Sequence, residues 1–324
     1  MNLVDLTKQF SDDDKAREFL EKKRWPGGPI CPHCGLEGEA YKLNPTENGK
    51  THVRKGVWKC AGCRKEFTVT VGTIFEDSKI PLHKWLIAFH LLCSSKKGMS
   101  AHQLHRMLGI TYKSAWFMAH RIRYAMAQEP LSSKLPGILE IDETYIGGKL
   151  RTGPHATKPS ERPQDRKAGI DNKAPVVSVL QRGGRVQSTH VEKVTAKNLK
   201  PVIEQMVAEN AIMMTDDSSV LESASGTRQH YRVNHSAEEY VRHENGLCIT
   251  TNGVEGYFSI LKRGVNGVYH HWSKKYLHRY LSEFDFRYNA RKISDGERAE
   301  LAIKGVNGKR LMLRDSSAAS PKNN

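Results

Sequence analysis

The sequence predicts a multidomain protein that combines α+β and α/β parts. Three observations support this fold class: two Cys-x-x-Cys pairs near the N-terminus, amphipathic helical patterns over residues 81–126, and alternating strand and helix patterns from residue 138 onward. A chain of 324 residues is also long enough for two or three domains and at least one substantial core.

Basic residues strongly outnumber acidic ones. The 51 Lys and Arg residues against 35 Asp and Glu residues give a net charge of +16. Such an excess favours a polyanionic partner, and nucleic acid is the commonest. An anionic membrane surface is the alternative, but no apolar run approaches the length of a membrane span, and the N-terminus lacks a signal-peptide core. We therefore expect a soluble, cytoplasmic protein that binds a nucleic acid, with double-stranded DNA as its partner.

Four of the six cysteines form two pairs, Cys31 with Cys34 and Cys60 with Cys63. In a reducing compartment this pattern indicates a metal site more often than disulfides. Four thiolates at such spacing bind one tetrahedral Zn2+. A site closed by four protein ligands leaves no open coordination position, so we expect a structural zinc that holds together a zinc ribbon.

The helical region contains a pattern typical of a helix-turn-helix. Two short helices are expected around a turn at Gly109. The second helix would present Lys113, Arg121 and Arg123 on its polar side, and we expect these residues to contact DNA. An ordinary helical bundle with a solvated basic face is the alternative.

Acidic side chains mark two of the expected strands. Residues 138–145 have a strand pattern in which Asp142 lies opposite the apolar face, together with Glu140. A carboxylate in the middle of a strand is locally unfavourable, which suggests a functional reason for it. The apolar strand 211–215 ends at Asp216 and Asp217, and the C-terminal end of a strand is where α/β sheets place ligands.

A third acid lies in the stretch 250–264, which is typical of a short helix. Asn252 would begin this helix, and Glu255 and Lys262 would share one face two turns apart. The spacing of Asn252 and Glu255 also fits a capping box, in which Glu255 would only close the start of the helix. The acids found elsewhere in the chain favour a functional role for Glu255.

Two strands and one helix would thus contribute the carboxylates of Asp142, Asp216 and Glu255. Three carboxylates suffice for two Mg2+ ions, because Mg2+ takes few protein ligands and shares phosphate oxygens with its substrate. Such a pair of ions, about 3.5–4 Å apart, supports phosphoryl transfer. Lys262 would then contact a phosphate or a base near the cut site.

The chain resembles bacterial insertion-sequence transposases of the DDE type with an N-terminal zinc ribbon (the ISXO type). The resemblance covers most of residues 1–291, and it is carried in the family's order by residues 24–35, 140–148, 215–216, 233–236, 251–264 and 279–289. The family pattern favours Asp216 over Asp217 as the second acid. One departure is Thr250, which stands where the family often has a histidine.

The resemblance implies a ribonuclease-H-like catalytic domain with a mixed sheet. Asp142, Asp216 and Glu255 would bind two Mg2+ or Mn2+ ions, and Lys262 would be the basic residue that follows the third acid. Asn252 and Arg263 on the same helix would be further DNA contacts. The implied enzyme binds terminal inverted repeats, cleaves the 3′ ends of the element and joins them to target DNA, acting as a homo-oligomer.

Two other functions are alternatives: a non-enzymatic regulator with a zinc ribbon and a helix-turn-helix, and a nuclease of the same fold that joins nothing. We expect five segments: an N-terminal helix (1–24), the zinc ribbon (25–76), the helix-turn-helix segment (77–131), the catalytic domain (132–291) with a basic loop (147–173), and a partly disordered C-terminal tail (292–324).

Overall fold

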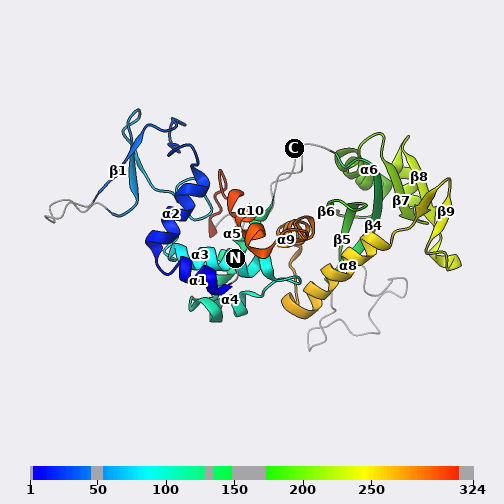
Figure 1. Ribbon diagram of the computed structural model, residues 1–324. Coiled ribbons are helices and arrows are strands. Elements are labelled where there is room, and N and C mark those ends of the chain that lie inside the picture. Colours follow the sequence, from blue (N-terminus) through cyan, green and yellow to red (C-terminus); the bar gives the residue numbers. More distant parts are fainter. Residues whose placement is uncertain (1–2, 45–53, 128–133, 148–172, 314–324) are drawn as a thin grey trace. The chain divides into compact units, whose positions relative to one another are not determined.

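The computed structural model describes residues 3–44, 54–127, 134–147 and 173–313 (Figure 1). The chain divides into two compact units, and the predicted multidomain class is confirmed. Unit 1 comprises residues 1–95, 99–127 and 293–324, and unit 2 comprises residues 96–98 and 128–292. In the described ranges, each helix is too short or too polar to cross a bilayer.

Unit 1 begins with two helices, α1 (Leu3–Gln9) and α2 (Asp13–Arg24), where the sequence predicted one helix over residues 1–24. The break lies at Asp12, whose backbone is extended. Its carboxylate accepts a hydrogen bond from the backbone N–H of Lys15 at 2.9 Å and so caps the second helix.

A small antiparallel sheet follows in unit 1. Its strand order is β1 (Ala40–Leu43), β2 (Val57–Cys60) and β3 (Glu66–Phe67). The sheet is too small to bury a core of its own, which is the situation that a structural metal resolves in small domains.

The helical part of unit 1 follows the expected pattern. It contains α3 (Leu82–Ser94), α4 (Ala101–Leu108) and α5 (Tyr112–Met126). Helix α4 ends at Gly109, which adopts the left-handed conformation that glycine favours, and the side chain of Thr111 caps α5. The local geometry of two helices around a short turn is therefore present, while its role in DNA binding stays a prediction.

The C-terminal segment, predicted as a partly disordered tail, contains a packed helix. Helix α10 (Asp295–Lys304) packs against α3 and α5, and Val306 and Leu311 beyond it are buried. A capping box between Ser294 and Glu297 begins this helix, and its apolar side faces the neighbouring helices. Residues 293–313 thus complete the core of unit 1, and residues 314–324 lie outside the described ranges.

Unit 2 is built on a mixed five-stranded sheet with the strand order β6-β5-β4-β7-β8. The central strand β4 pairs antiparallel with β5 and parallel with β7, and β8 is parallel to β7. The strands are β4 (Ile138–Ile146), β5 (Ala174–Gln181), β6 (Val186–His190), β7 (Ile212–Asp216) and β8 (Gln229–Val233).

Helices cover both faces of this sheet (Figure 1). Helices α6 (Ala196–Met206) and α7 (Ser219–Ser225) pack on one face, and α8 (Asn252–Gly264) and α9 (Leu277–Asn289) pack on the other. Because Val177 and Val179 of β5 face α6 while Val176 and Leu180 face α8, this strand is buried on both sides.

The remaining elements of unit 2 surround α8. The hairpin β9 (Arg242–Glu244) and β10 (Leu247–Ile249) precedes it, and η3 (Val265–Tyr269) extends it. Two further short turns are η2 (His235–Ala237) and η4 (Lys274–Tyr276). Nearly all of the predicted basic loop, residues 148–172, lies outside the described part of the chain.

Candidate active site and metal centres

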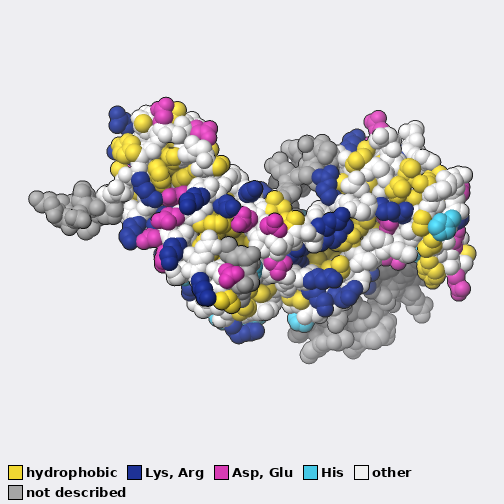
Figure 2. All heavy atoms as spheres, in the orientation of Figure 1, with side chains coloured by type: hydrophobic (Ala, Val, Ile, Leu, Met, Phe, Trp, Pro, Cys, Tyr) yellow, Lys and Arg dark blue, Asp and Glu magenta, His cyan; other side chains and the backbone are white. Residues whose placement is uncertain are grey.

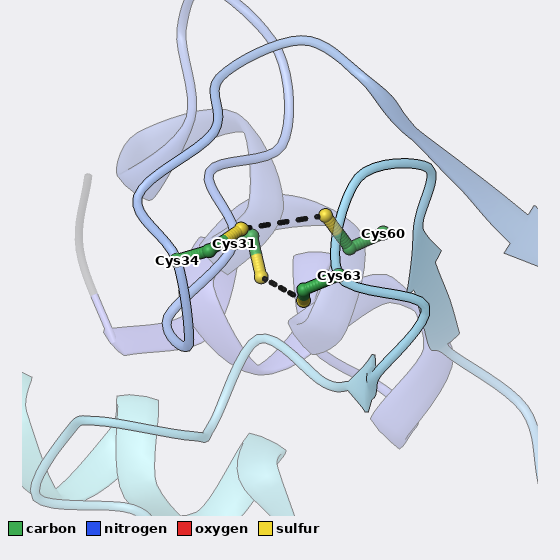
Figure 3. A group of neighbouring side chains, drawn as sticks. All are labelled: Cys31, Cys34, Cys60 and Cys63. Carbon is green, nitrogen blue, oxygen red and sulfur yellow. Dashed lines mark hydrogen bonds between the residues drawn. The ribbon is translucent and has the colours of Figure 1, made fainter.

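The four predicted zinc ligands meet at one end of the small sheet (Figure 3). The Sγ atoms of Cys31 and Cys63 are 3.6 Å apart, as are those of Cys34 and Cys60. These separations are far longer than a disulfide bond. Thiolates at about 2.3 Å from a tetrahedral Zn2+ are about 3.8 Å from one another, so the four sulfurs fit one zinc ion.

The second predicted centre lies in unit 2 at the C-terminal end of β7, where the pairing of β4 with β7 stops. Side-chain oxygens of Asp142 on β4 and Asp216 at the end of β7 lie within 4.8 Å of one another and of Glu143. The pairing of β4 with β7 places Glu140 opposite Met214, so Asp142 and Asp216 follow two residues later on neighbouring strands. The parallel register therefore brings the first two predicted acids together.

Glu143 is the member of this cluster that the sequence analysis missed. Alternation along a strand would place it on the face opposite Asp142. However, β4 continues to Ile146 after its last pairing with β7 at Glu140, which leaves this part of β4 open on the β7 side. The Oε2 atom of Glu143 is buried and has no hydrogen-bond partner among the described residues.

The structure favours Asp216 over its neighbour Asp217. The Oδ1 atom of Asp216 is buried and has no hydrogen-bond partner in the described part of the chain, which fits a cation ligand. Asp217 is exposed, and its carboxylate lies 3.5 Å from the guanidinium of Arg232.

Glu255 projects from α8 into the cavity that Asp142 lines. Its Oε1 accepts a hydrogen bond from the Thr251 hydroxyl at 3.2 Å and lies 3.6 Å from Nε2 of His235. The capping box considered for Asn252 and Glu255 is not formed, because Asn252 is already the first residue of α8 and the N-cap residue Thr251 makes no side-chain capping bond. His235, which approaches from η2, was not among the site residues predicted from the sequence, and Thr250 occupies the position expected for a histidine.

A cavity of about 810 Å³ connects the acids with basic side chains. Lys262 and Arg263 of α8 line it, together with Lys97, which was not among the residues predicted from the sequence. Lys and Arg side chains gather over α8 on the face shown in Figure 2. The cavity therefore offers carboxylates for a cation beside cations for a phosphate.

Burial and mutual repulsion disturb the acids of this site. Burial raises the pKa of Asp142 to about 7, and the charge of Asp216 adds to the shift. The pKa values of Asp216 and Glu143 are raised as well, mainly by burial; nearby Glu255 raises that of Asp216 further, and His235 counteracts this. A divalent cation would relieve this repulsion, so the pattern is what a metal site requires.

A buried carboxylate outside the acid cluster supports the start of α8. Glu140, which precedes Asp142 by two residues on β4, accepts hydrogen bonds from the backbone N–H groups of Gly253 and Val254 at 2.7 and 3.1 Å. These are two of the orphan donors that every helix start leaves. A residue of the central strand thus replaces the local cap that the sequence predicted at Asn252.

The five predicted DNA contacts fall into two groups. Lys113 in the first turn of α5, Asn252 at the start of α8 and Arg263 near its end are exposed. By contrast, Arg121 and Arg123 are only 5% and 2% exposed. Arg121 donates hydrogen bonds to carbonyl oxygens of residues 74, 76 and 311, because the C-terminal segment covers this side of α5. The prediction that Arg121 and Arg123 contact DNA is therefore corrected.

Removal of the zinc should unfold the ribbon. We expect Cys60→Ser, or chelation of the wild type, to abolish the structure of residues 31–44 and 54–66, because the small sheet has no core to replace the metal. The amide hydrogen exchange of this segment measures the effect, and Cys93→Ser, at a buried cysteine outside the cluster, is the control. Full protection of the ribbon after chelation would contradict a structural zinc.

The raised pKa of Asp142 predicts a pH-dependent stability. Its usual value is 3.8, so the folded chain holds this proton more tightly, and the stabilisation that protonation brings is lost as the pH rises through about 7. Asp142→Asn stays neutral and should raise the free energy of unfolding at pH 8 by roughly 2–4 kcal/mol, with little effect near pH 4. Urea unfolding in Mg2+-free buffer tests this, with substitution of the exposed Asp217 (Asp217→Asn) as control. An equal gain in the free energy of unfolding at both pH values would contradict a raised pKa of Asp142.

Two family models match the chain. The ISXO2-like transposase domain matches residues 134–289, and the transposase zinc-ribbon domain matches residues 11–66. The second match and the four-cysteine cluster together support a structural Zn2+. The order of the two domains along the chain is the one expected from the sequence.

The chain is also similar to two known proteins. An "uncharacterized protein in transposable element ISH50" of Halobacterium salinarum is 26% identical over 299 residues, which cover 86% of this chain and 92% of that protein. The crystal structure of a pre-cleavage Mos1 transpososome is 11% identical with a TM-score of 0.24, over 64% of this chain and 70% of that chain. A likeness as weak as the second bears on neither fold nor function.

Both matched domains are transposase domains, and together they span more than half of the chain. The acid cluster and the five-stranded sheet lie within the residues of the first match, and the four cysteines lie within those of the second. The chain therefore carries an ISXO2-like transposase domain, with a transposase zinc-ribbon domain on its N-terminal side.

Proposed function

We propose that this transposase binds the terminal inverted repeats of its own element, cleaves the 3′ ends and joins them to target DNA. Both steps are phosphoryl transfers at one metal-dependent site formed by Asp142, Asp216 and Glu255. The observation that supports this proposal best is the convergence of β4, β7 and α8 on one edge of the sheet, with acids from the two strands beside a cavity that Glu255 and basic residues line.

The carboxylates of Asp142, Asp216 and Glu255 would hold the cations, and Glu143 is close enough to take part. Two Mg2+ or Mn2+ ions bound there would activate a water or a 3′-hydroxyl and stabilise the leaving oxygen. The oxygens of Glu143 and Asp216 that lack partners among the described residues are suitable ligands, since hard cations prefer oxygen.

The basic wall of the cavity would position the DNA. Lys262 lies on the cavity two turns after Glu255 on α8, so it can neutralise a phosphate next to the bound cations. Lys97 and Arg263 extend this wall, and the exposed Asn252 lies at the other end of the same helix. These side chains would hold the scissile phosphate without a covalent enzyme intermediate.

Recognition of the element's ends falls to unit 1 in this proposal. Lys113 is exposed in the first turn of α5, the part of a helix-turn-helix that reaches base edges in the major groove. The net charge of +16 favours DNA throughout. Because transposition joins two ends, we further propose that the protein acts as a homo-oligomer on DNA, in the bacterial cytoplasm.

Substitution of acids inside and outside the site tests whether Asp216 and Glu255 are catalytic. Asp216→Asn and Glu255→Gln should each lower Mg2+-dependent cleavage of a duplex carrying the element's ends by about 100-fold or more, because each removes a charge that holds the cations. Asp217→Asn is the matched control, since this exposed side chain pairs with Arg232, and it should keep the wild-type rate.

Retained binding of the same duplex by all three variants would show that the fold is intact. If Glu255→Gln stayed active and lost only about 1 kcal/mol of stability, as a helix that loses a cap would, the catalytic assignment would be wrong. Cleavage without joining in the wild type would indicate a nuclease of the same fold.

A further inference from the structure

We propose that Glu140 is a positioning residue of the active site: it fixes the first turn of α8 to β4 and so holds Glu255 in register with Asp142 for cation binding. This inference rests on the proposed function of the site. Glu140 lies outside the acid cluster, and its carboxylate faces the helix start rather than the cavity.

The hydrogen bonds of Glu140 connect two parts of the chain that are far apart in sequence. Its side chain is only 3% exposed, and its Oε2 accepts from the backbone N–H groups of Gly253 at 2.7 Å and Val254 at 3.1 Å. A carboxylate at a helix N-terminus satisfies these donors and interacts favourably with the helix dipole. Helices usually obtain such a cap from the preceding residues. Here Thr251 makes no capping bond and Thr250 accepts only from the N–H of Asn252 at 3.2 Å, so the donors of Gly253 and Val254 depend on Glu140.

Arg182 completes this connection. Its guanidinium lies 3.0–3.1 Å from Oε1 of Glu140 and donates to the carbonyl oxygens of Cys248 at 2.7 Å and Thr250 at 3.4 Å. The arginine thereby holds the segment that leads into α8. It also compensates the charge of Glu140, which would otherwise be costly to bury.

The spacing of the residues links this arrangement to the acids of the site. Glu140 and Asp142 are two apart on β4, so their side chains leave the same face of the strand. Gly253, Val254 and Glu255 belong to the first turn of α8. The distance between Asp142 and Glu255 therefore depends on how closely Glu140 holds that turn.

Gly253 shows how closely the helix approaches the strand. A Cβ atom at this position would lie 2.6 Å from Oε2 of Glu140, so any side chain would force the carboxylate or the helix to move. A Cβ at Gly256, one turn further along the same helix, would meet no atom within 4 Å. The two glycines thus provide a matched pair of substitutions.

The test compares Glu140→Gln, Gly253→Ala and Gly256→Ala in the full chain. Mn2+ binding without DNA is measured by calorimetry, and the Mg2+ concentration for half-maximal cleavage is measured alongside. We expect the first two variants to weaken Mn2+ binding and to raise the Mg2+ requirement by about 10–100-fold, as changes next to metal ligands commonly do. Gly256→Ala should leave both values unchanged.

A purely structural role for Glu140 would give a different result. Glu140→Gln and Gly253→Ala would then lower the melting temperature while Mn2+ affinity and Mg2+ requirement stayed at wild-type values, and the inference would be overturned. If Glu140→Gln failed to fold, Gly253→Ala would carry the test, because it retains the charged pair of Glu140 and Arg182 and changes only how closely the helix start can approach it.

Failure of the proposed function would give a result that differs from failure of the Glu140 inference alone. Wild type and Asp142→Asn would then bind Mn2+ equally, and the role of Glu140 would be refuted together with the metal site. If the wild type binds and Asp142→Asn does not, the site stands, and the glycine pair decides on Glu140 alone.

Discussion

The parallel pairing of β4 with β7 is the constraint on which the arrangement of unit 2 depends. Carboxylates that follow the same register position on two parallel strands must lie side by side, and the opposition of Glu140 and Met214 puts Asp142 beside Asp216. Helix α8 then needs to approach this edge from one face of the sheet. The apolar side of α8 packs on the sheet. Its polar side therefore faces the cavity with Glu255 and Lys262.

This arrangement concentrates negative charge in a partly buried place. The pKa of Asp142 rises to about 7, and buried oxygens of Glu143 and Asp216 lack partners among the described residues. Such groups lower the stability of the cation-free fold, so the surrounding structure must hold them together. The two apolar clusters on the faces of the sheet supply the packing, and a cation would convert the repulsion into binding energy.

The sequence was sufficient where function depends on local pattern or on strand ends. The spacing of the cysteines predicted the four-sulfur cluster, and the acids at strand positions predicted that Asp142 and Asp216 would meet. The sequence was insufficient where the burial or the partner of a side chain depends on a segment far away along the chain. Arg121 looked like a surface residue because nothing local indicates that residue 311 returns to accept its hydrogen bond. Glu143 was missed because alternation along the strand places it on the face opposite Asp142. His235 was missed because it lies in a polar segment without a regular pattern.

The most direct test of the account is a strand-transfer assay in which Mg2+, a duplex with the element's own ends and target DNA are incubated with wild type or Asp142→Asn. The wild type should produce 3′-hydroxyl ends and join them to the target. The variant should bind the same duplex without cutting it. Tight binding without cleavage by either protein, or equal cleavage by both, would contradict the assignment of the acids.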